Sequence, residues 1–358
     1  MLSSFPAPGC ARGKRATVAA TDDTRREAMD DKVSRLPITL ATATLLAAVA
    51  SLFIGYAPLS AATVIDGLLN DTGTAGVIMR DIRLPRMLLG LLAGAALGMS
   101  GAALQGLLRN PLAEPGVMGI ASFASLGAVI AIYFGLSTAF LFALPLIAML
   151  GALIAAVVLS LLSGRDNGVL TLILAGVALA NLAAALMALA LNLAPNPYAV
   201  SEIVFWILGS LKDRSFDDVL LAAPFVAVGL ALLASTGRAL DALTLGEDAA
   251  KSLGIETISI QRRVIAGVTL AVGASVAVTG AIAFVGLIVP HLCRPFVGHT
   301  PSRLLIPSAI GGALLVLIAD IAVRMVPSGP ELMLGVFTSL IGVPFFLWLV
   351  FKLRRELT

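Results

Sequence analysis

The sequence predicts an all-α polytopic membrane protein that crosses a lipid bilayer about ten times. The 358 residues are 59% hydrophobic and only 13% charged, whereas a soluble domain is about 25% charged. Uncharged runs of membrane length follow one another from residue 36 to residue 351, and about 20 such residues in a helix span a bilayer core. Lipid is therefore the expected solvent for this surface, and a large domain outside the membrane is not expected.

Residues 1–35 form a polar segment before the first apolar run. They contain several arginines and lysines, and they lack an apolar core followed by a small-residue cleavage site. We predict a disordered cytoplasmic tail that is not a cleaved signal peptide, and Met29 is an alternative start of the chain. The membrane domain is then predicted to cover residues 36–352.

Each predicted span is an uncharged run bounded by charged residues, proline or glycine. The run 115–164 is too long for one helix and is divided at residues 135–137. Pro290 and Pro295 are expected to break the short eighth span, and residues 197–214 are predicted to lie outside, with Trp206 at the interface. The predicted spans are 36–57, 86–108, 117–135, 139–162, 169–193, 217–235, 260–280, 286–299, 303–325 and 331–351.

The distribution of positive charge predicts the orientation. With the N-terminus in the cytoplasm, most lysines and arginines fall in cytoplasmic segments, as the positive-inside rule requires. An even number of spans then places both termini in the cytoplasm. The basic residues left on the outer side are Arg80, Arg83, Arg86, Lys212, Arg214 and Arg324.

Two patterns of small residues concern helix packing. Gly90, Gly94 and Gly98 lie on one helix face, which favours close approach of another helix in lipid. The spacing Gly94-x6-Gly101-x9-Pro111 also recurs 179 residues later as Gly273-x6-Gly280-x9-Pro290. An offset of five spans inverts the second copy, and inverted repeats are typical of transporters.

Residues 110–116, Asn-Pro-Leu-Ala-Glu-Pro-Gly, interrupt the helical pattern at the cytoplasmic end of the second span. Two prolines and a glycine do not permit a continuous helix. The segment is either an ordinary tight turn or a cytoplasmic gate, because irregular backbone at membrane depth must be buried or line a cavity.

Arg83, Arg86 and Arg324 are predicted at the outer rim, against the usual charge bias. They could bind carboxylates of an acidic partner. They could instead pair within the chain, since Asp81 is near Arg83 and Asp320 precedes Arg324 by one helical turn. Both interpretations remain open from the sequence.

Residues 245–255 form a cytoplasmic loop with helical character, and Gly254 suits a helix C-cap. The loop either connects two spans or contacts a cytosolic partner.

The sequence lacks the motifs of ATP binding, enzyme catalysis and proton relay. There is no phosphate-binding loop of the Gly-x4-Gly-Lys-Ser/Thr type, no nucleophile–base arrangement and no buried series of carboxylates for a proton relay. Cys10 and Cys293 suggest no disulfide framework, and His291 and His299 are too few for a metal centre. We therefore expect no enzyme activity, no cofactor on this chain and no nucleic-acid partner.

Six segments resemble the permease subunits of type II ABC importers for ferric siderophores, haem and cobalamin. They occur in the order of that family from about residue 80 to residue 351. The matching segments are RLPRMLLGLLAGAALGMSGAALQGLLRNPLAEPGVMGI, LILAGVALA, LTLGEDAAKSLGI, TGAIAFVGLIVPHLCRPF, LIADIAVR and GVFTSLIGVPFFLWLV.

The resemblance implies a bacterial inner-membrane subunit that works as a homodimer on two ATP-hydrolysing subunits, which bind ATP and Mg²⁺. A periplasmic binding protein would deliver the ligand. The implied docking residues are Arg83, Arg86 and Arg324, the implied cytoplasmic gate is Asn110, Leu112 and Val169, and the residues implied to face the ATPase are Gly246, Glu247, Ala250 and Gly254.

Two segments depart from the family. Residues 168–170 lack the hydroxyl side chains of the vitamin B12 permease gate, which makes cobalamin a less secure substrate, and residues 326–330 are rich in proline. An iron chelate is the expected cargo, with cobalamin as the alternative. A secondary transporter driven by an ion gradient also fits an inverted repeat, but it would need embedded carboxylates for the coupling ion.

Overall fold

The computed structural model describes residues 33, 35–70, 73–136, 140, 142–162, 169–326 and 332–357. The predicted tail at residues 1–35 and Met29 therefore lie almost wholly outside the described residues, as do Gly168 and residues 327–331. The first helix spans Arg35–Phe53. The other α-helices are α2 Ala61–Leu69, α3 Gly73–Val77, α4 Leu84–Leu107, α5 Ile120–Tyr133, α6 Ala143–Leu162, α7 Val169–Asn192, α8 Pro197–Leu208, α9 Phe216–Ser235, α10 Gly237–Leu243, α11 Glu247–Ser252, α12 Thr257–Thr279, α13 Val285–Cys293, α14 Pro301–Met325 and α15 Leu334–Leu357.

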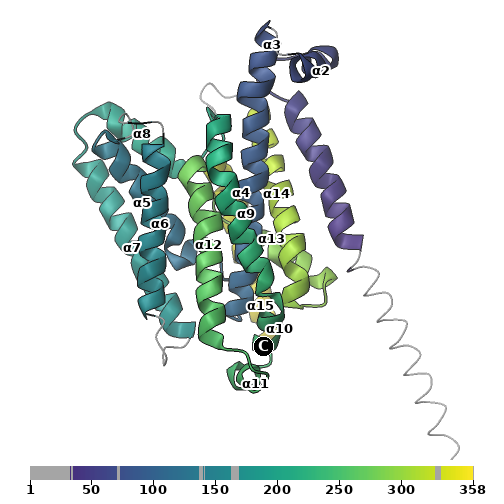
Figure 1. Cartoon of the computed structure of the whole chain (residues 1–358), viewed down its shortest axis with the longest axis vertical. Helices are drawn as coiled ribbons and strands as arrows, with labels where there is room; N and C mark the ends of the chain where they lie inside the picture. Colours follow the sequence, from purple (N-terminus) through teal and green to yellow (C-terminus); the bar gives the residue numbers. More distant parts are fainter. Residues whose placement is uncertain are drawn as a thin grey trace, which may run out of the picture.

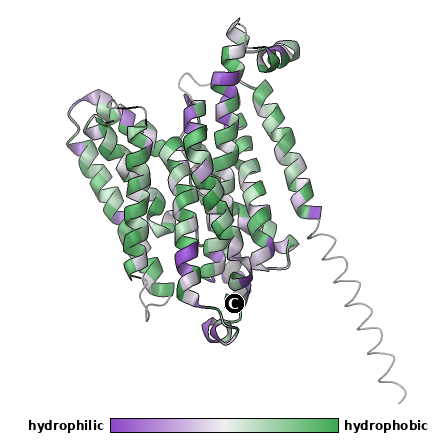
Figure 2. Cartoon of the chain, viewed as in Figure 1, coloured by the Kyte–Doolittle hydropathy of each residue, from purple (hydrophilic) through white to green (hydrophobic). Residues whose placement is uncertain are grey.

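The long helices run roughly side by side, with α4, α9, α12 and α14 in the middle of the bundle and α5, α6 and α7 on one flank (Figure 1). The first helix stands at the opposite edge, where the Thr44 hydroxyl donates to the Ile310 carbonyl of α14 at 3.3 Å. Hydrophobic residues dominate the middle of the helices and hydrophilic residues gather near their two ends (Figure 2). This banding is what a bilayer requires of a protein that spans it.

A helix exists at each of the ten predicted spans, but two of these helices, α5 and α13, are too short to cross a membrane. Among the described residues, eight helices are long and apolar enough to cross a membrane. The span predicted at 117–135 is reduced to α5, because a 3₁₀ turn at Pro115–Met118 and the left-handed Gly119 precede it. The span predicted at 286–299 is reduced to α13 and a 3₁₀ turn at Arg294–Phe296. Pro290 lies inside α13 and does not break it, which corrects the prediction.

The second span starts earlier than predicted. α3, a π-helical turn at Ile78–Arg83 and α4 form one continuous 35-residue helix, Gly73–Leu107. Arg83 and Arg86 therefore lie within a helix and not at its end. Pro85 lacks an N–H donor and lies directly after the π-helical turn, where the regular α-helical hydrogen-bond pattern is already interrupted.

The glycine face of α4 packs closely on neighbouring helices, as predicted. A Cβ atom added to Gly98 would lie 1.9 Å from the Ser308 carbonyl oxygen of α14, and one added to Gly94 would lie 2.3 Å from that of Gly312. Gly101 makes an equally close contact with Gly286 of α13. Backbone contact of this kind supports helix association in lipid, where apolar burial gives little driving force.

The two copies of the predicted repeat run in opposite directions: α4 passes from α3 toward the end that carries α10 and α11, and α12 returns from that end (Figure 1). Their local structures differ, however. Gly101 is inside α4, whereas Gly280 terminates α12 with φ of 70°. Pro111 lies in a turn, whereas Pro290 lies inside a helix.

Short helices outside the predicted spans were missed. Ser60 caps the start of α2, and its hydroxyl accepts from the Thr63 amide. α8 occupies most of the segment 197–214, which was predicted only as an outer connection. Both are shorter than a membrane span, so a search for long apolar runs does not detect them.

Candidate functional site

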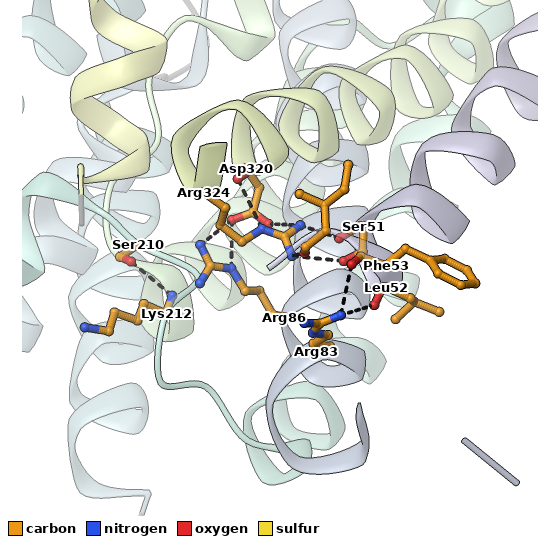
Figure 3. A network of polar contacts seen from close by, with 10 residues as sticks. Ser51, Leu52, Phe53, Arg83, Arg86, Ser210, Lys212, Asp320 and Arg324 are labelled. Carbon is orange, nitrogen blue, oxygen red and sulfur yellow. Dashed lines mark hydrogen bonds and ion pairs between the residues drawn. The ribbon is translucent and has the colours of Figure 1, made fainter. Parts of the chain in front are cut away.

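The three arginines predicted at the outer rim converge on one buried cluster. Arg83 and Arg86 come from the π-helical turn and the start of α4, and Arg324 comes from the end of α14 (Figure 3). Their exposed fractions are only 4%, 7% and 7%, and Asp320, which lies among them, is 1% exposed. Charged side chains are rarely buried unless they are paired, so the partners of this cluster determine what it does.

Asp320 holds two of the arginines. Arg86 donates from Nε to Asp320 Oδ1 at 2.9 Å, and its Nη2 lies 2.8 Å from the same oxygen. Arg324 Nη2 forms an ion pair with Asp320 Oδ2 at 2.9 Å, one turn along α14. The carboxylate thus joins α4 to α14 and offsets one of the two positive charges.

Arg83 and Arg324 bind the carboxyl-terminal end of the first helix. Arg83 donates to the carbonyl oxygens of Leu52 at 2.6 Å, Phe53 at 3.2 Å and Ala57 at 2.6 Å. Arg324 donates to the carbonyls of Ser51 and Ile54 and to the Ser51 hydroxyl. The last carbonyls of a helix have no partner within it and carry partial negative charge, so cationic donors stabilise this end.

The pairing of Arg324 with Asp320, left open by the sequence, is therefore present in the structure. Arg83 binds carbonyl groups and not the nearby Asp81, which corrects that alternative. Arg80, which the sequence argument did not assign, donates in the same way to Leu68 and Leu69 at the end of α2. The spacing of Arg80, Arg83 and Arg86 every three residues on one helix was the signal that could have indicated this series.

Lys212 and Arg214, the other cations predicted on the outer side, differ from the three arginines of the cluster. Lys212 is exposed, and its Nζ lies 4.0 Å from Asp213 Oδ2. Arg214 stacks over the Trp206 ring at 4.7 Å from its centroid. Burial lowers the pKa of Arg214, since desolvation opposes the charged form, while Asp218 and Asp213 act in the opposite direction.

The turn after α4 is ordered by its own side chain. The Leu112 amide donates to Asn110 Oδ1 at 2.9 Å, and the Ala113 amide donates to the Asn110 carbonyl at 3.2 Å. Asparagine favours such turns because its side chain replaces a backbone acceptor. Asn110 and Leu112 are both partly buried.

Val169, the third residue of the predicted gate, is the first residue of α7 and packs partly buried against the large apolar core. Further along α7, Gly176 approaches the segment 117–118 so closely that an added Cβ would lie 2.5 Å from the Val117 oxygen. α7 therefore contacts the chain that follows the turn. A gate formed by Val169 with Asn110 and Leu112 stays a prediction.

The predicted coupling segment at 245–255 contains α11 and is exposed at its two ends. Gly246 and Gly254 adopt φ of 104° and 77°, and no atom lies within 4 Å of a Cβ added at either position. Glu247 Oε1 lies 3.6 Å from Arg109 Nη2, with both side chains about two-fifths exposed. Ala250 is completely buried in the main apolar core, and its contact with an ATPase subunit stays a prediction.

Comparisons with known proteins agree with this architecture. Residues 43–352 match the FecCD transport family. The chain is 40% identical over 283 residues to the ABC transporter permease protein YvrB of Bacillus subtilis, an uncharacterized protein, covering 78% of this chain and 80% of that protein. It is 38% identical over 276 residues to the vitamin B12 import system permease protein BtuC of Escherichia coli O9:H4, covering 77% and 84%.

A solved structure has the same fold. An inward-facing conformation of a metal-chelate type ABC transporter superposes with a TM-score of 0.80 at 32% identity, covering 89% of this chain and 99% of that one. The helices, the matched range and these relatives together show a multi-pass integral protein of the inner membrane. The chain therefore belongs to the FecCD transport family and is a permease of the ABC importer class.

Proposed function

We propose that this chain is the membrane subunit of an ATP-driven importer that carries an iron chelate, a ferric siderophore or haem, into the cytoplasm. The observation that carries the proposal is the likeness, over nearly the whole chain, to a metal-chelate type ABC transporter. ATP hydrolysis takes place on two separate subunits, and no cofactor binds to this chain. Both termini lie in the cytoplasm, with the arginine cluster at the outer end.

Cobalamin is the second candidate substrate. The likeness to the vitamin B12 permease BtuC favours it. Val169 and its neighbour Leu170, which are apolar, favour a less polar inner constriction and hence the iron chelate. Cobalamin is itself a metal chelate, so either cargo agrees with the structural likeness.

Transport needs a second copy of this chain. α15 exposes a row of large apolar side chains, including Leu340, Val343 and Leu347. A cavity of about 620 Å³ lies between α8, residues 281–283 and α15. The apolar surface of α15 lies next to this cavity. Together they support a transport pathway formed between two copies of the chain.

Docking of a periplasmic binding protein involves Arg83, Arg86 and Arg324. Carboxylates of that protein compete for guanidinium groups that now bind Asp320 and the end of the first helix. Arginine suits this exchange because its five N–H donors bind carboxylates in a bidentate manner. Residues 51–57 then have to shift when the binding protein docks.

The decisive experiment measures uptake into proteoliposomes that contain this chain, its ATPase subunit and its binding protein. Labelled ferric chelate, haem and cobalamin are compared with and without ATP, after ionophores have collapsed the ion gradients. We expect uptake that requires ATP and survives the ionophores, and the cargo is the ligand that accumulates. Uptake that ignores ATP and is lost with the gradient would show a secondary transporter.

Docking is tested with the Arg83→Glu/Arg324→Glu variant in the same assembly. Each lost charge-assisted pair weakens binding by about tenfold or more, so the double variant should bind the loaded binding protein at least about 100-fold more weakly. Lys212→Glu, an exposed cation at the same end, is the matched control. A double variant that assembles with its ATPase and still docks and transports normally would reject this role.

A further inference from the structure

At the end of the molecule that carries α10 and α11, a cavity of about 220 Å³ is lined by cationic and donor side chains. Arg109 comes from the turn after α4, Arg294 from the 3₁₀ turn after α13, and His299 from the connection to α14. Gln105 and Thr244 complete its polar lining. The site lies far along the helices from the arginine cluster described above, which is at the opposite end of α4.

Arg294 is incompletely satisfied. Its Nη2 donates to Gln105 Oε1, and Gln105 in turn donates to the Gly286 carbonyl at 3.3 Å. The Nε–H of Arg294 is buried and has no hydrogen-bond partner among the described residues. A buried donor without a partner costs about 1–3 kcal/mol, so such a group in a native protein needs an explanation, and a bound water or anion is one.

Backbone strain accompanies this lining. Arg109 and His299 adopt φ of 49° and 64°, in the left-handed region that non-glycine residues seldom occupy. At Arg109 this conformation ends α4, where the Asn110 amide donates to the Gln105 carbonyl at 3.2 Å. Two residues of the cavity lining, Arg109 and His299, therefore have left-handed backbone conformations.

Few carboxylates lie near the cavity, and those that do already contact other groups. Glu247 contacts Arg109 at 3.6 Å, which is long for an ion pair. The Asp241 carboxylate accepts from the Ser302 amide at 2.8 Å and so caps the start of α14. Neither carboxylate lines the cavity, which leaves its positive charge without a buried counter-ion in the described part of the chain.

We propose that this cavity binds a phosphate group, either as a soluble anion or as the headgroup of an acidic lipid. Arginines on two different segments and a histidine on a third match the several acceptor oxygens of a phosphate, which binds guanidinium groups in a bidentate manner. An anion bound here competes with Glu247 for Arg109 and so reaches the segment 245–255. The site does not depend on which chelate is transported.

The test measures equilibrium binding of radiolabelled inorganic phosphate to the full-length chain in dodecyl maltoside, with chloride holding the ionic strength constant. We expect one saturable site, and affinity about tenfold lower in both Arg294→Gln and Arg109→Gln. Arg238→Gln removes an exposed arginine of α10 outside the cavity lining and should bind as the parent does. An absence of saturable binding in the parent, or equal affinity in all variants, would overturn the proposal.

Two further arms complete the design. If Arg294→Gln does not fold, His299→Gln replaces it. The His299 side chain is exposed, and its loss leaves the contact between Arg294 and Gln105 intact. Unchanged phosphate affinity in both His299→Gln and Arg109→Gln would reject the site. Binding is also measured in nanodiscs of phosphatidylcholine with and without phosphatidylglycerol. Competition by phosphatidylglycerol supports the site and assigns it to lipid, whereas unchanged affinity supports a soluble anion.

Discussion

Arg86 and Asp320 form a buried hydrogen-bonded ion pair that joins α4 to α14, with 2.9 Å between Nε and Oδ1. Arg324 approaches the other carboxylate oxygen at 2.9 Å. The charges of Arg86, Asp320 and Arg324 are all removed from water. Whether they stabilise the fold therefore depends on the geometry of their contacts more than on the number of charges. The same cluster fixes the end of the first helix through Arg324 and Arg83.

Asp320→Asn is expected to destabilise the protein strongly. It leaves Arg86 and Arg324 buried without a counter-charge, and breaking a buried ion pair from one side costs about 3–5 kcal/mol. The measurement is the midpoint of thermal unfolding in detergent. Asp217→Asn, an exposed carboxylate at the start of α9, is the control and should cost less than about 1 kcal/mol. Equal midpoints for the two variants would show that the buried pair contributes little.

Arg83→Met is expected to loosen the end of the first helix. Three donated hydrogen bonds to residues 52–57 are lost, so amide hydrogens there should exchange faster. Hydrogen–deuterium exchange with mass spectrometry of the peptides covering 50–70 measures this change.

Arg80→Met provides the matched comparison for Arg83→Met. It removes the contacts to Leu68 and Leu69, so increased exchange should be confined to the end of α2. Identical exchange patterns in the two variants would mean that the arginines do not act on separate helix ends.

Gly98→Ala is expected to disturb the contact of α4 with α14. The added methyl group would lie 1.9 Å from the Ser308 carbonyl oxygen, so the two backbones must separate. Overpacking of this kind costs about 1–3 kcal/mol or more. Gly106→Ala, on the same helix, meets its nearest atoms at 3.4 Å and should be neutral or slightly stabilising. Thermal unfolding distinguishes the two, and a Gly98→Ala midpoint equal to that of the parent contradicts the close packing.

Glu247→Lys is expected to weaken assembly with the ATPase subunit while leaving the stability of this chain nearly unchanged. The contact with Arg109 is long and partly exposed, so its loss should change the free energy of unfolding by less than about 1 kcal/mol. If Glu247 faces the ATPase, as the family resemblance implies, the variant should no longer co-purify with that subunit. Asp248→Lys, a neighbouring exposed position, is the control. Undiminished co-purification of the Glu247 variant would remove its coupling role.

The periodicity of the sequence was sufficient for the framework of the fold. Every predicted span contains a helix, because backbone polar groups in a bilayer must be hydrogen-bonded within the segment. The glycines of α4 were also correctly interpreted, since Gly94 and Gly98 lie on one helix face whatever helix packs against them. Short helices such as α2 and α8 escaped detection because no such constraint acts on them.

The sequence by itself determined the class, the order of the helices and the residue types available at the site. Only the tertiary structure decided which groups meet. Arg86 binds Asp320 across 234 positions of the chain, and Arg83 binds the carbonyl of Leu52 across 31. Ala250 packs into the main apolar core for the same reason. Local patterns determine the face of a helix, whereas the partner of that face depends on how all the helices pack together.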